Sequence, residues 1–324
     1  MRPCPEALPA RGQWIREQRV AVIEARALVK TFGALRAVDG VDFRVERGET
    51  FGLLGPNGAG KTSIMRMLAG LSPISGGQLF LSGLNVAEQS RAVRARLGVV
   101  TQADGLDGEL TVRQNLEVFG FLIGLSRRQA RARADEVLGF FRLRDRGDAE
   151  VDELSGGMRR RLAIARALMG EPEVIILDEP STGLDPESRI RVWEELAELK
   201  RADVTLLMST HYMDEAETLC DRIAIMHSGR ILDEGSPPEL IKRHAGSAAL
   251  DIRPDGASRE DIRSRLRAAG LPYREVGAII RVTGGNGGVP RLPALEGVQV
   301  SERAANLEDV FLTLAGRGLQ EDQP

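Results

Sequence analysis

Short runs of apolar residues alternate along this chain with stretches whose apolar residues recur every three or four positions. The first pattern indicates buried strands and the second indicates amphipathic helices. We expect strands at Val20–Leu28, Val41–Val45, Phe51–Leu54, Leu97–Val100, Glu173–Leu177, Val204–Ser209 and Arg222–His227. We expect helices at Thr62–Gly70, Gly156–Met169, Pro186–Arg201 and Met213–Cys220. Alternating helices and buried strands are typical of an α/β fold with a mostly parallel sheet.

The strand pattern is absent between Leu110 and Gly147. Thr111–Leu125 is apolar with helical spacing, and Arg127–Phe141 has the pattern of an arginine-rich amphipathic helix. We therefore predict a helical subdomain, at about residues 103–165, inserted into the strand-bearing domain.

The pattern changes again after Ser236. His244–Ala248 has the character of a linker, and Ala249–Leu319 alternates as strands do, around a helix at Arg259–Ala269. A last helix places four apolar residues on one face that must pack: Leu307, Val310, Phe311 and Leu314. The predicted organisation is a flexible N-terminal tail (1–19), a main domain (20–243) and a small C-terminal α+β domain (249–319).

Composition narrows the class of protein. A chain of 324 residues that is 42% hydrophobic and 28% charged can build a packed core, which excludes disordered and collagen-like classes. Its 44 basic and 47 acidic residues give a net charge of −3, which argues against a dedicated nucleic-acid binder. Two cysteines, Cys4 and Cys220, are too few for a disulfide framework or a zinc site.

The sequence also bears on location. The longest apolar run, Val118–Leu125, is far shorter than the ~20 residues that span a bilayer. Met1–Arg19 lacks the apolar segment of a signal peptide. We therefore expect a cytoplasmic protein that does not cross a membrane by itself.

A glycine-rich turn between a buried strand and a helix carries the strongest chemical signal. Gly55–Thr62 matches the phosphate-loop pattern G-x-x-x-x-G-K-[ST] in the required setting. Backbone N–H groups of such a loop, with the N-terminus of the next helix, surround phosphate groups. We expect Lys61 to reach the β- and γ-phosphates, the Thr62 hydroxyl to ligate Mg²⁺ and Ser63 to bind the α-phosphate. The remaining loop residues that we assign to the nucleotide are Gly55, Pro56, Asn57, Gly58, Ala59 and Gly60.

Two carboxylates follow the buried strand that ends at Leu177. Asp178 is expected to anchor Mg²⁺ beside the phosphate loop, and Glu179 to polarise an attacking water. A turn with two solvated acids is the alternative, and a phosphate loop on the same sheet argues against it. His211 follows the strand Val204–Ser209 at the same edge, where an imidazole can contact the γ-phosphate and hold the water and Glu179 in register.

One further motif makes the pattern specific. Leu154-Ser-Gly-Gly-Met158 precedes a helix and lies 24 residues before Asp178. Together with the phosphate loop, in this order, it resembles the nucleotide-binding subunit of ATP-binding-cassette (ABC) transporters. The resemblance covers about Ala21–Leu240 and implies a P-loop NTPase (RecA-like) fold that binds ATP and Mg²⁺.

The resemblance assigns roles to further residues. Phe32 would stack on adenine, and Gln102 would be the Q-loop glutamine, at once a catalytic group and a Mg²⁺ ligand. Asp185 ends the segment that resembles the D-loop. Ser155, Gly156 and Gly157 form a second helix N-terminus that attracts anions, and in the family it closes over ATP held by a second subunit.

Met158 departs from the more usual glutamine of that motif. Met158 followed by Arg159–Arg161 is similar to the exporter branch (ABC-2 type) that includes daunorubicin-type drug exporters and nodulation-factor exporters. The ending Leu307–Gly316 also resembles that branch.

The resemblance therefore implies the ATPase subunit of a bacterial ABC exporter. It would work as a homodimer, peripheral on the inner face of the cell membrane, with a separate multi-spanning permease and no nucleic acid. Val118–Leu125 would then be core of the helical subdomain, part of the groove that receives a permease helix, or both. The small C-terminal domain would regulate, lengthen the dimer interface or stabilise the fold.

Two other classes of protein share part of this pattern. A soluble ABC ATPase acting on ribosomes or DNA usually has two cassettes or a long coiled-coil insertion, and neither pattern occurs in this sequence. A P-loop kinase or GTPase would share only Gly55–Thr62.

Overall fold

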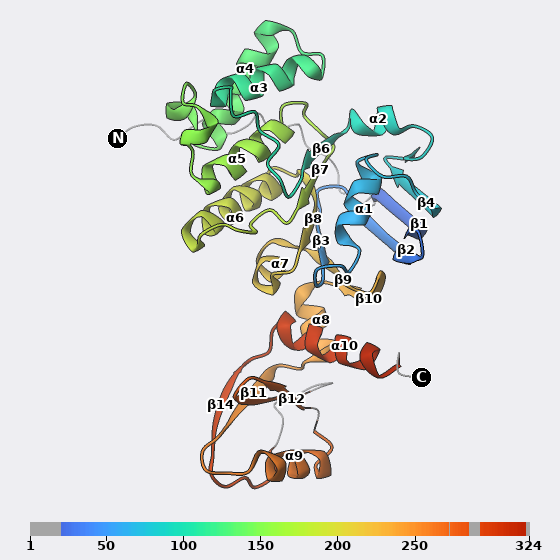
Figure 1. Cartoon of the computed structure of the whole chain (residues 1–324), viewed down its shortest axis with the longest axis vertical. Coiled ribbons are helices and arrows are strands. Elements are labelled where there is room, and N and C mark those ends of the chain that lie inside the picture. The colour runs from blue at the N-terminus through green and yellow to red at the C-terminus, as the bar shows by residue number, and fades with distance from the viewer. Residues whose placement is uncertain (1–20, 272, 285–291, 322–324) are drawn as a thin grey trace.

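The computed structural model describes residues 21–271, 273–284 and 292–321, so the predicted tail at 1–19 lies outside the described residues. A large α/β body occupies one end of the long axis, and a small domain of strands and one helix occupies the other (Figure 1). The last helix, α10 (Leu307–Glu321), lies between them.

A six-stranded sheet in the order β10-β9-β3-β8-β7-β6 forms the centre of the body. Its strands are β3 (Thr50–Leu54), β6 (Leu97–Val100), β7 (Val174–Asp178), β8 (Thr205–Thr210), β9 (Arg222–His227) and β10 (Arg230–Gly235). All neighbours pair in parallel except β10, which is antiparallel to β9. Every residue of β3, β7 and β8 is buried, which explains their uninterrupted apolar runs. The predicted mostly parallel sheet is confirmed.

The two strands predicted at Val20–Leu28 and Val41–Val45 belong to a second sheet, whose other strands the sequence does not predict. It is antiparallel, in the order β2-β1-β4-β5, and lies beside helix α1 (Lys61–Leu68). Its strands are β1 (Ala21–Phe32), β2 (Leu35–Glu46), β4 (Gly76–Leu81) and β5 (Leu84–Asn85). The sequence predicts no strand at β4 or β5, since β4 begins with two glycines and β5 is two residues long. Pairing with β1 gives β4 its strand conformation.

Helices cover both faces of the central sheet and create two separate cores. Ile175 and Leu177 of β7 point into one core, and Val174 and Ile176 point into the other. The first core contains the helical subdomain, and the second contains α1 and the antiparallel sheet. The remaining helices of the body are α2 (Ser90–Arg94), α3 (Val112–Leu122), α4 (Arg127–Phe140), α5 (Gly156–Ala167), α6 (Pro186–Arg201) and α7 (Met213–Leu219), with 3₁₀ turns at Arg144–Arg146 and Val151–Glu153.

The helical subdomain has the predicted helices. Capping boxes start both of the first two: Thr111 with Gln114 for α3, and Ser126 with Gln129 for α4. The apolar segment Val118–Leu125 has two environments, because Gly120 is buried whereas Leu122 is 79% exposed.

The small domain is an antiparallel sheet with one helix across it. Its elements are β11 (Ala248–Pro254), α9 (Arg259–Ala268), β12 (Tyr273–Val276), β13 (Ile279–Thr283) and β14 (Val298–Ala304), with sheet order β12-β13-β11-β14. The predicted linker at His244–Ala248 is wrong at both ends. Helix α8 (Pro237–His244) includes His244, since a capping box at Ser236 and Glu239 starts it, and β11 already begins at Ala248.

Helix α10 leaves the small sheet and packs against α7 and α8. Leu307, Val310 and Leu314 belong to the core of the large body, and the ring of Phe311 lies 6.5 Å from that of His227. The apolar face expected of this helix is therefore used, but on the body rather than on the small domain. Bidentate ion pairing between Arg303 and the buried Asp309 ties the start of α10 back to β14.

Candidate active site

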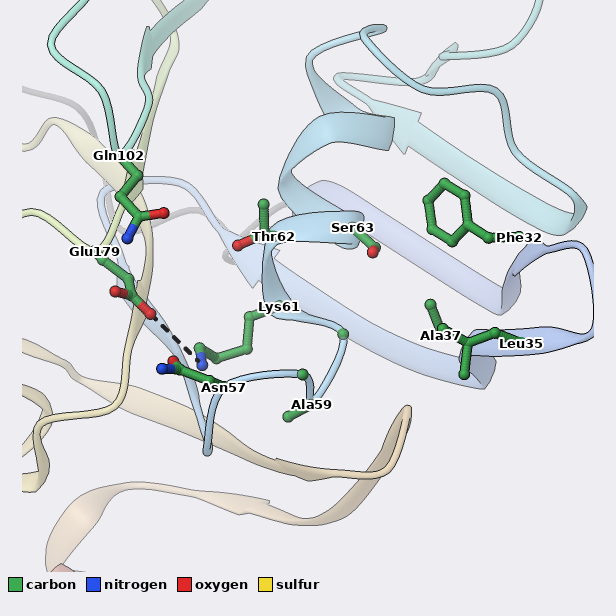
Figure 2. Close-up of a pocket in the computed structure, with 12 residues that line it drawn as sticks. Phe32, Leu35, Ala37, Asn57, Ala59, Lys61, Thr62, Ser63, Gln102 and Glu179 are labelled. Carbon is green, nitrogen blue, oxygen red and sulfur yellow. Dashed lines mark ion pairs between the residues drawn. The ribbon is translucent and has the colours of Figure 1, made fainter.

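A cavity of about 420 Å³ opens where β3, β6 and β7 end. The carboxyl ends of neighbouring parallel strands are the usual place for ligands in open α/β sheets. Figure 2 shows Gln102 and Glu179 at one end of it, Phe32 and Leu35 at the other, and Lys61 and Thr62 between them. The cavity is lined by Phe32, Leu35, Ala37, Asn57, Gly58, Ala59, Gly60, Lys61, Thr62, Ser63, Gln102 and Glu179.

The phosphate loop depends on glycine at two close approaches. A Cβ on Gly55 would lie 2.3 Å from the carbonyl oxygen of Met226, and one on Gly60 would lie 2.4 Å from that of Ala37. Gly60 also has a φ of +103°, a conformation that residues with a side chain rarely adopt. These contacts press the loop onto β2 and β9, so that the N-terminus of α1 faces the cavity.

Lys61 brings a positive charge into this loop. Its Nζ donates hydrogen bonds to the carbonyl oxygens of Gly55 (2.7 Å) and Pro56 (2.9 Å) and lies 3.9 Å from Glu179 Oε1 (Figure 2). Burial lowers the pKa of Lys61, while the charges of Glu179 and Asp178 act in the opposite direction. An anion in the cavity would add to those opposing charges and favour the ammonium form.

Asp178 and Thr62 join the two sides of the cavity. Asp178 Oδ1 accepts hydrogen bonds from Thr62 Oγ1 (3.1 Å) and from the buried Ser209 Oγ (2.5 Å). A hydroxyl and a carboxylate oxygen side by side, with the Gln102 amide lining the same cavity, are the hard oxygen donors that Mg²⁺ prefers. Within the described ranges there is no cluster of three or more Asp, Glu, His or Cys side chains that could hold a metal alone. The donor set thus fits a Mg²⁺ ion that a phosphate group helps to bind.

Glu179 has a left-handed backbone and two side-chain neighbours besides Lys61. Its φ of +50° costs energy for a residue other than glycine, so the surrounding contacts must hold it there. Its Oε2 accepts a hydrogen bond from Thr182 Oγ1 (3.1 Å), and its Oε1 lies 3.2 Å from His211 Nδ1. The His211 contact does not have the angle of a hydrogen bond, so it is a close approach of the two side chains.

The opposite end of the cavity is apolar. The Phe32 side chain is half exposed there, with Lys30 Nζ 4.7 Å from the centre of its ring. Leu35 and Ala37 of β2 also line this end and were not anticipated. The sequence has one indication of a role for Leu35. It is a large apolar residue close to the β1–β2 turn, where burial in the core would not explain it.

The second glycine-rich helix start does not contribute to this cavity. Ser155 caps α5 by accepting a hydrogen bond from the N–H of Met158, and Ser155 and Gly156 are exposed. A Cβ on Gly157 would lie 2.4 Å from Ser188 Oγ, so α5 and α6 start side by side. Asp185 caps α6, and the hydrogen bonds from Ser188 lower its pKa. In the described part of the chain, these residues are separate from the cavity lining.

Comparison with known proteins agrees with this geometry. A protein-family model described as "ABC transporter" matches residues 38–182. Nod factor export ATP-binding protein I of Burkholderia lata is 44% identical over 305 residues, which cover 93% of this chain and 99% of that protein.

Two solved structures also resemble this chain. CbiO1 of Clostridium perfringens, described as part of the ABC transporter complex CbiONQ, is 26% identical with a TM-score of 0.64, covering 77% of this chain and 97% of CbiO1. The dimeric structure of MJ0796, a bacterial ABC transporter cassette, is 25% identical with a TM-score of 0.61, covering 66% of this chain and 98% of that one.

Proposed function

The chain belongs to the ATP-binding subunits of ABC transporters, and on that premise we propose that it drives export through a separate membrane permease. As a member of that family it binds and hydrolyses ATP. The observation that carries the proposal is that the phosphate loop and Glu179 line one cavity, with Asp178 hydrogen bonded to Thr62 of that lining. The name of the Burkholderia lata relative favours export over a soluble ATPase that acts on ribosomes or DNA.

In this proposal one side of the cavity binds ATP. Phe32 stacks on the adenine, the N–H groups of Gly55–Gly60 and the Ser63 hydroxyl hold the phosphates, and Lys61 reaches the β- and γ-phosphates. Thr62, Asp178 and Gln102 would hold Mg²⁺. The ion would neutralise part of the charge that builds up on the phosphate groups during hydrolysis.

The other side carries the chemistry. Glu179 accepts a proton from the attacking water, and its backbone aims the carboxylate toward Lys61 and hence toward the γ-phosphate. His211, 3.2 Å from Glu179, keeps this carboxylate and the water in register. These roles need both side chains at the same strand ends, which β7 and β8 supply as neighbours.

We propose that the working unit is a homodimer. Ser155, Gly156, Gly157 and Asp185 lie outside the cavity of their own chain, and a second copy would use them to complete its site. The dimeric structure of the related cassette supports this arrangement. ATP bound between two such surfaces holds the subunits together, and hydrolysis removes that contact.

The permease partner is proposed from an exposed apolar patch. Val118, Phe121, Leu122 and Ile123, at the end of α3, are 40%, 41%, 79% and 43% exposed. Apolar side chains gathered in this way mark interaction surfaces, and we assign this one to a cytoplasmic helix of the permease. The helices of the described residues include none that is both long and apolar enough to span a bilayer. The proposed location is therefore peripheral, on the cytoplasmic face of the cell membrane.

The proposed domain division follows the same roles. Residues 20–243 form the nucleotide-binding domain, with the helical subdomain at about 103–165 facing the permease. Residues 249–319 form an accessory domain attached to it through α10.

Partner capture tests the export proposal. Tagged Glu179→Gln protein, loaded with ATP, is mixed with gently solubilised native membranes, and what co-purifies is identified. A multi-spanning membrane protein is expected, and it should be lost when Leu122→Glu is added, although ATP binding is unchanged. Capture of ribosomes or DNA-repair proteins with no membrane protein would contradict the proposal.

A further inference from the structure

Arg160 is a buried arginine on α5, within two turns of Ser155. Its side chain is directed away from solvent, toward the ends of β6 and β7, and it contacts no part of the cavity lining apart from the Glu179 backbone. Burial lowers the pKa of Arg160, and the nearby Asp104, Asp178 and Glu215 act against that shift. A buried guanidinium needs a partner for each of its N–H groups, so the contacts of Arg160 identify what it holds.

Those contacts are backbone carbonyl oxygens at the ends of two strands. Nη2 donates to Asp178 O (2.9 Å) and Glu179 O (3.1 Å), and Nε donates to Pro180 O (2.8 Å). Nη1 donates to Thr101 O (2.7 Å) and lies 3.5 Å from Asp104 Oδ1. One side chain therefore bonds to three consecutive carbonyl groups, at residues 178–180. It also contacts Thr101 and Asp104, which lie on either side of Gln102 in the chain.

We propose that Arg160 is a positioning residue, which fixes the backbone of Glu179 and of the Gln102 segment and connects both to the helix that begins at Ser155. The inference rests on the proposed role of Glu179 as the base. It concerns the backbone that aims the carboxylate, since Arg160 does not touch the carboxylate itself.

The left-handed backbone of Glu179 explains why these hydrogen bonds matter. A residue with a side chain stays in that conformation only when its surroundings hold it there. On the amino side, the Glu179 N–H donates to Ser209 O and Ser209 Oγ, both at 3.1 Å. On the carboxyl side, Arg160 holds the carbonyls of Glu179 and Pro180. Without Arg160, only the Thr182 N–H (3.3 Å) still bonds to the Glu179 carbonyl, so the backbone that aims the carboxylate loses most of its restraint on this side.

The same contacts connect helix α5 mechanically to the backbone of Glu179. The residues proposed to bind the second subunit's ATP, Ser155–Gly157, start this helix, and Arg160 is on its second turn. A rigid helix that shifts when the subunits close would carry the guanidinium with it. Closure of one subunit on the other would then change the aim of Glu179 in the subunit that supplies Ser155.

The neighbouring residue provides a matched control. Arg161 is also largely buried on α5, but it donates to the carbonyl oxygen of Phe141 (3.1 Å) and lies 3.4 Å from Glu195 Oε1, away from the cavity. Arg160→Gln and Arg161→Gln therefore each remove a buried guanidinium from one helix. Arg160→Lys keeps the charge but presents one nitrogen in place of the planar guanidinium. This variant tests the inference if Arg160→Gln does not fold.

For wild type and the three variants, the measurements are the steady-state kcat and KM for ATP, nucleotide affinity and thermal unfolding. We expect the kcat of Arg160→Gln to fall on the order of 10- to 100-fold with KM and affinity within about twofold of wild type, because a misplacement of about 1 Å has that effect. Arg160→Lys should lie between Arg160→Gln and wild type. Arg161→Gln should lose stability to a similar extent and keep its kcat.

Equal kcat values for Arg160→Gln and Arg161→Gln would overturn the inference and leave Arg160 as a structural residue. A parallel loss of kcat and stability in both variants would do the same. Failure of the proposed role of Glu179 looks different, because Glu179→Gln would then hydrolyse ATP at a rate close to that of the wild type.

Discussion

Two helices of this protein begin at glycine-rich turns, and only one of them faces a finished site. Helix α1 starts at Lys61, inside a cavity that already holds Asp178, Glu179 and Gln102 nearby. Helix α5 starts after Ser155 on an exposed surface, where its N–H groups meet no such partners from the described residues of its own chain. The two helix ends have the same affinity for anions in principle, so their surroundings decide what each can do.

This difference separates nucleotide binding within one chain from steps that need a second chain. In the proposed arrangement, the α1 site holds the nucleotide within one chain. The α5 site would contribute only when a second chain brings a phosphate group to it. Variants in the two sites should therefore affect different measurements, and a variant of the acid beside α1 should affect a third.

The largest effect is expected from the acid. Glu179→Gln should lower the rate of ATP hydrolysis by about 10²- to 10⁴-fold while ATP still binds, since the amide cannot accept the proton from water. Single-turnover hydrolysis and nucleotide affinity measure the two properties separately. Glu260→Gln on α9 is the control for the loss of an acid elsewhere. Turnover close to wild type would remove Glu179 from the role of base.

The comparison between the helix ends is tested by Ser155→Arg. The larger, charged side chain should block closure onto a second subunit and lower hydrolysis at least about tenfold, because the groups of the second subunit are then out of position. The ATP affinity of the monomer should be unchanged. Lys61→Ala is the matched variant at α1. It should weaken monomer binding by about tenfold or more, the value of ~1.5–3 kcal/mol for hydrogen bonds to a charged group. If Ser155→Arg weakened monomer binding to the same extent as Lys61→Ala, the two ends would belong to one site.

The smallest effect is expected at the apolar end of the cavity. Phe32→Ala should weaken ATP binding by ~1 kcal/mol, about fivefold, the low end of base stacking on an aromatic ring, because Phe32 is half exposed. The rate at saturating ATP should stay the same, and Phe32→Tyr, which keeps a ring, should restore affinity. An unchanged affinity of Phe32→Ala would place the base elsewhere.

The sequence was sufficient for features that depend on neighbours along the chain. The phosphate loop, the strand Leu97–Val100 and the helix Pro186–Arg201 are local patterns, and the structure has the same bounds for that strand and helix. Features that depend on distant partners were missed. Strand β4 begins with two glycines and β10 has two apolar residues among six, and both exist because β1 and β9 offer free backbone groups to pair with. The sequence also could not predict the role proposed for Arg160. A run of three arginines does not show which of them is exposed and which bonds to four backbone carbonyl groups.

Helix α10 also determines the order in which the molecule can be completed during synthesis. Leu307, Val310 and Leu314 fill the core of the large body, yet the ribosome makes them only after the whole small domain. Until they emerge, the nascent body has an open hydrophobic surface between α7 and α8, of the kind that attracts chaperones or other unfinished chains. The small domain thus sets the moment at which the ATPase acquires its closed core.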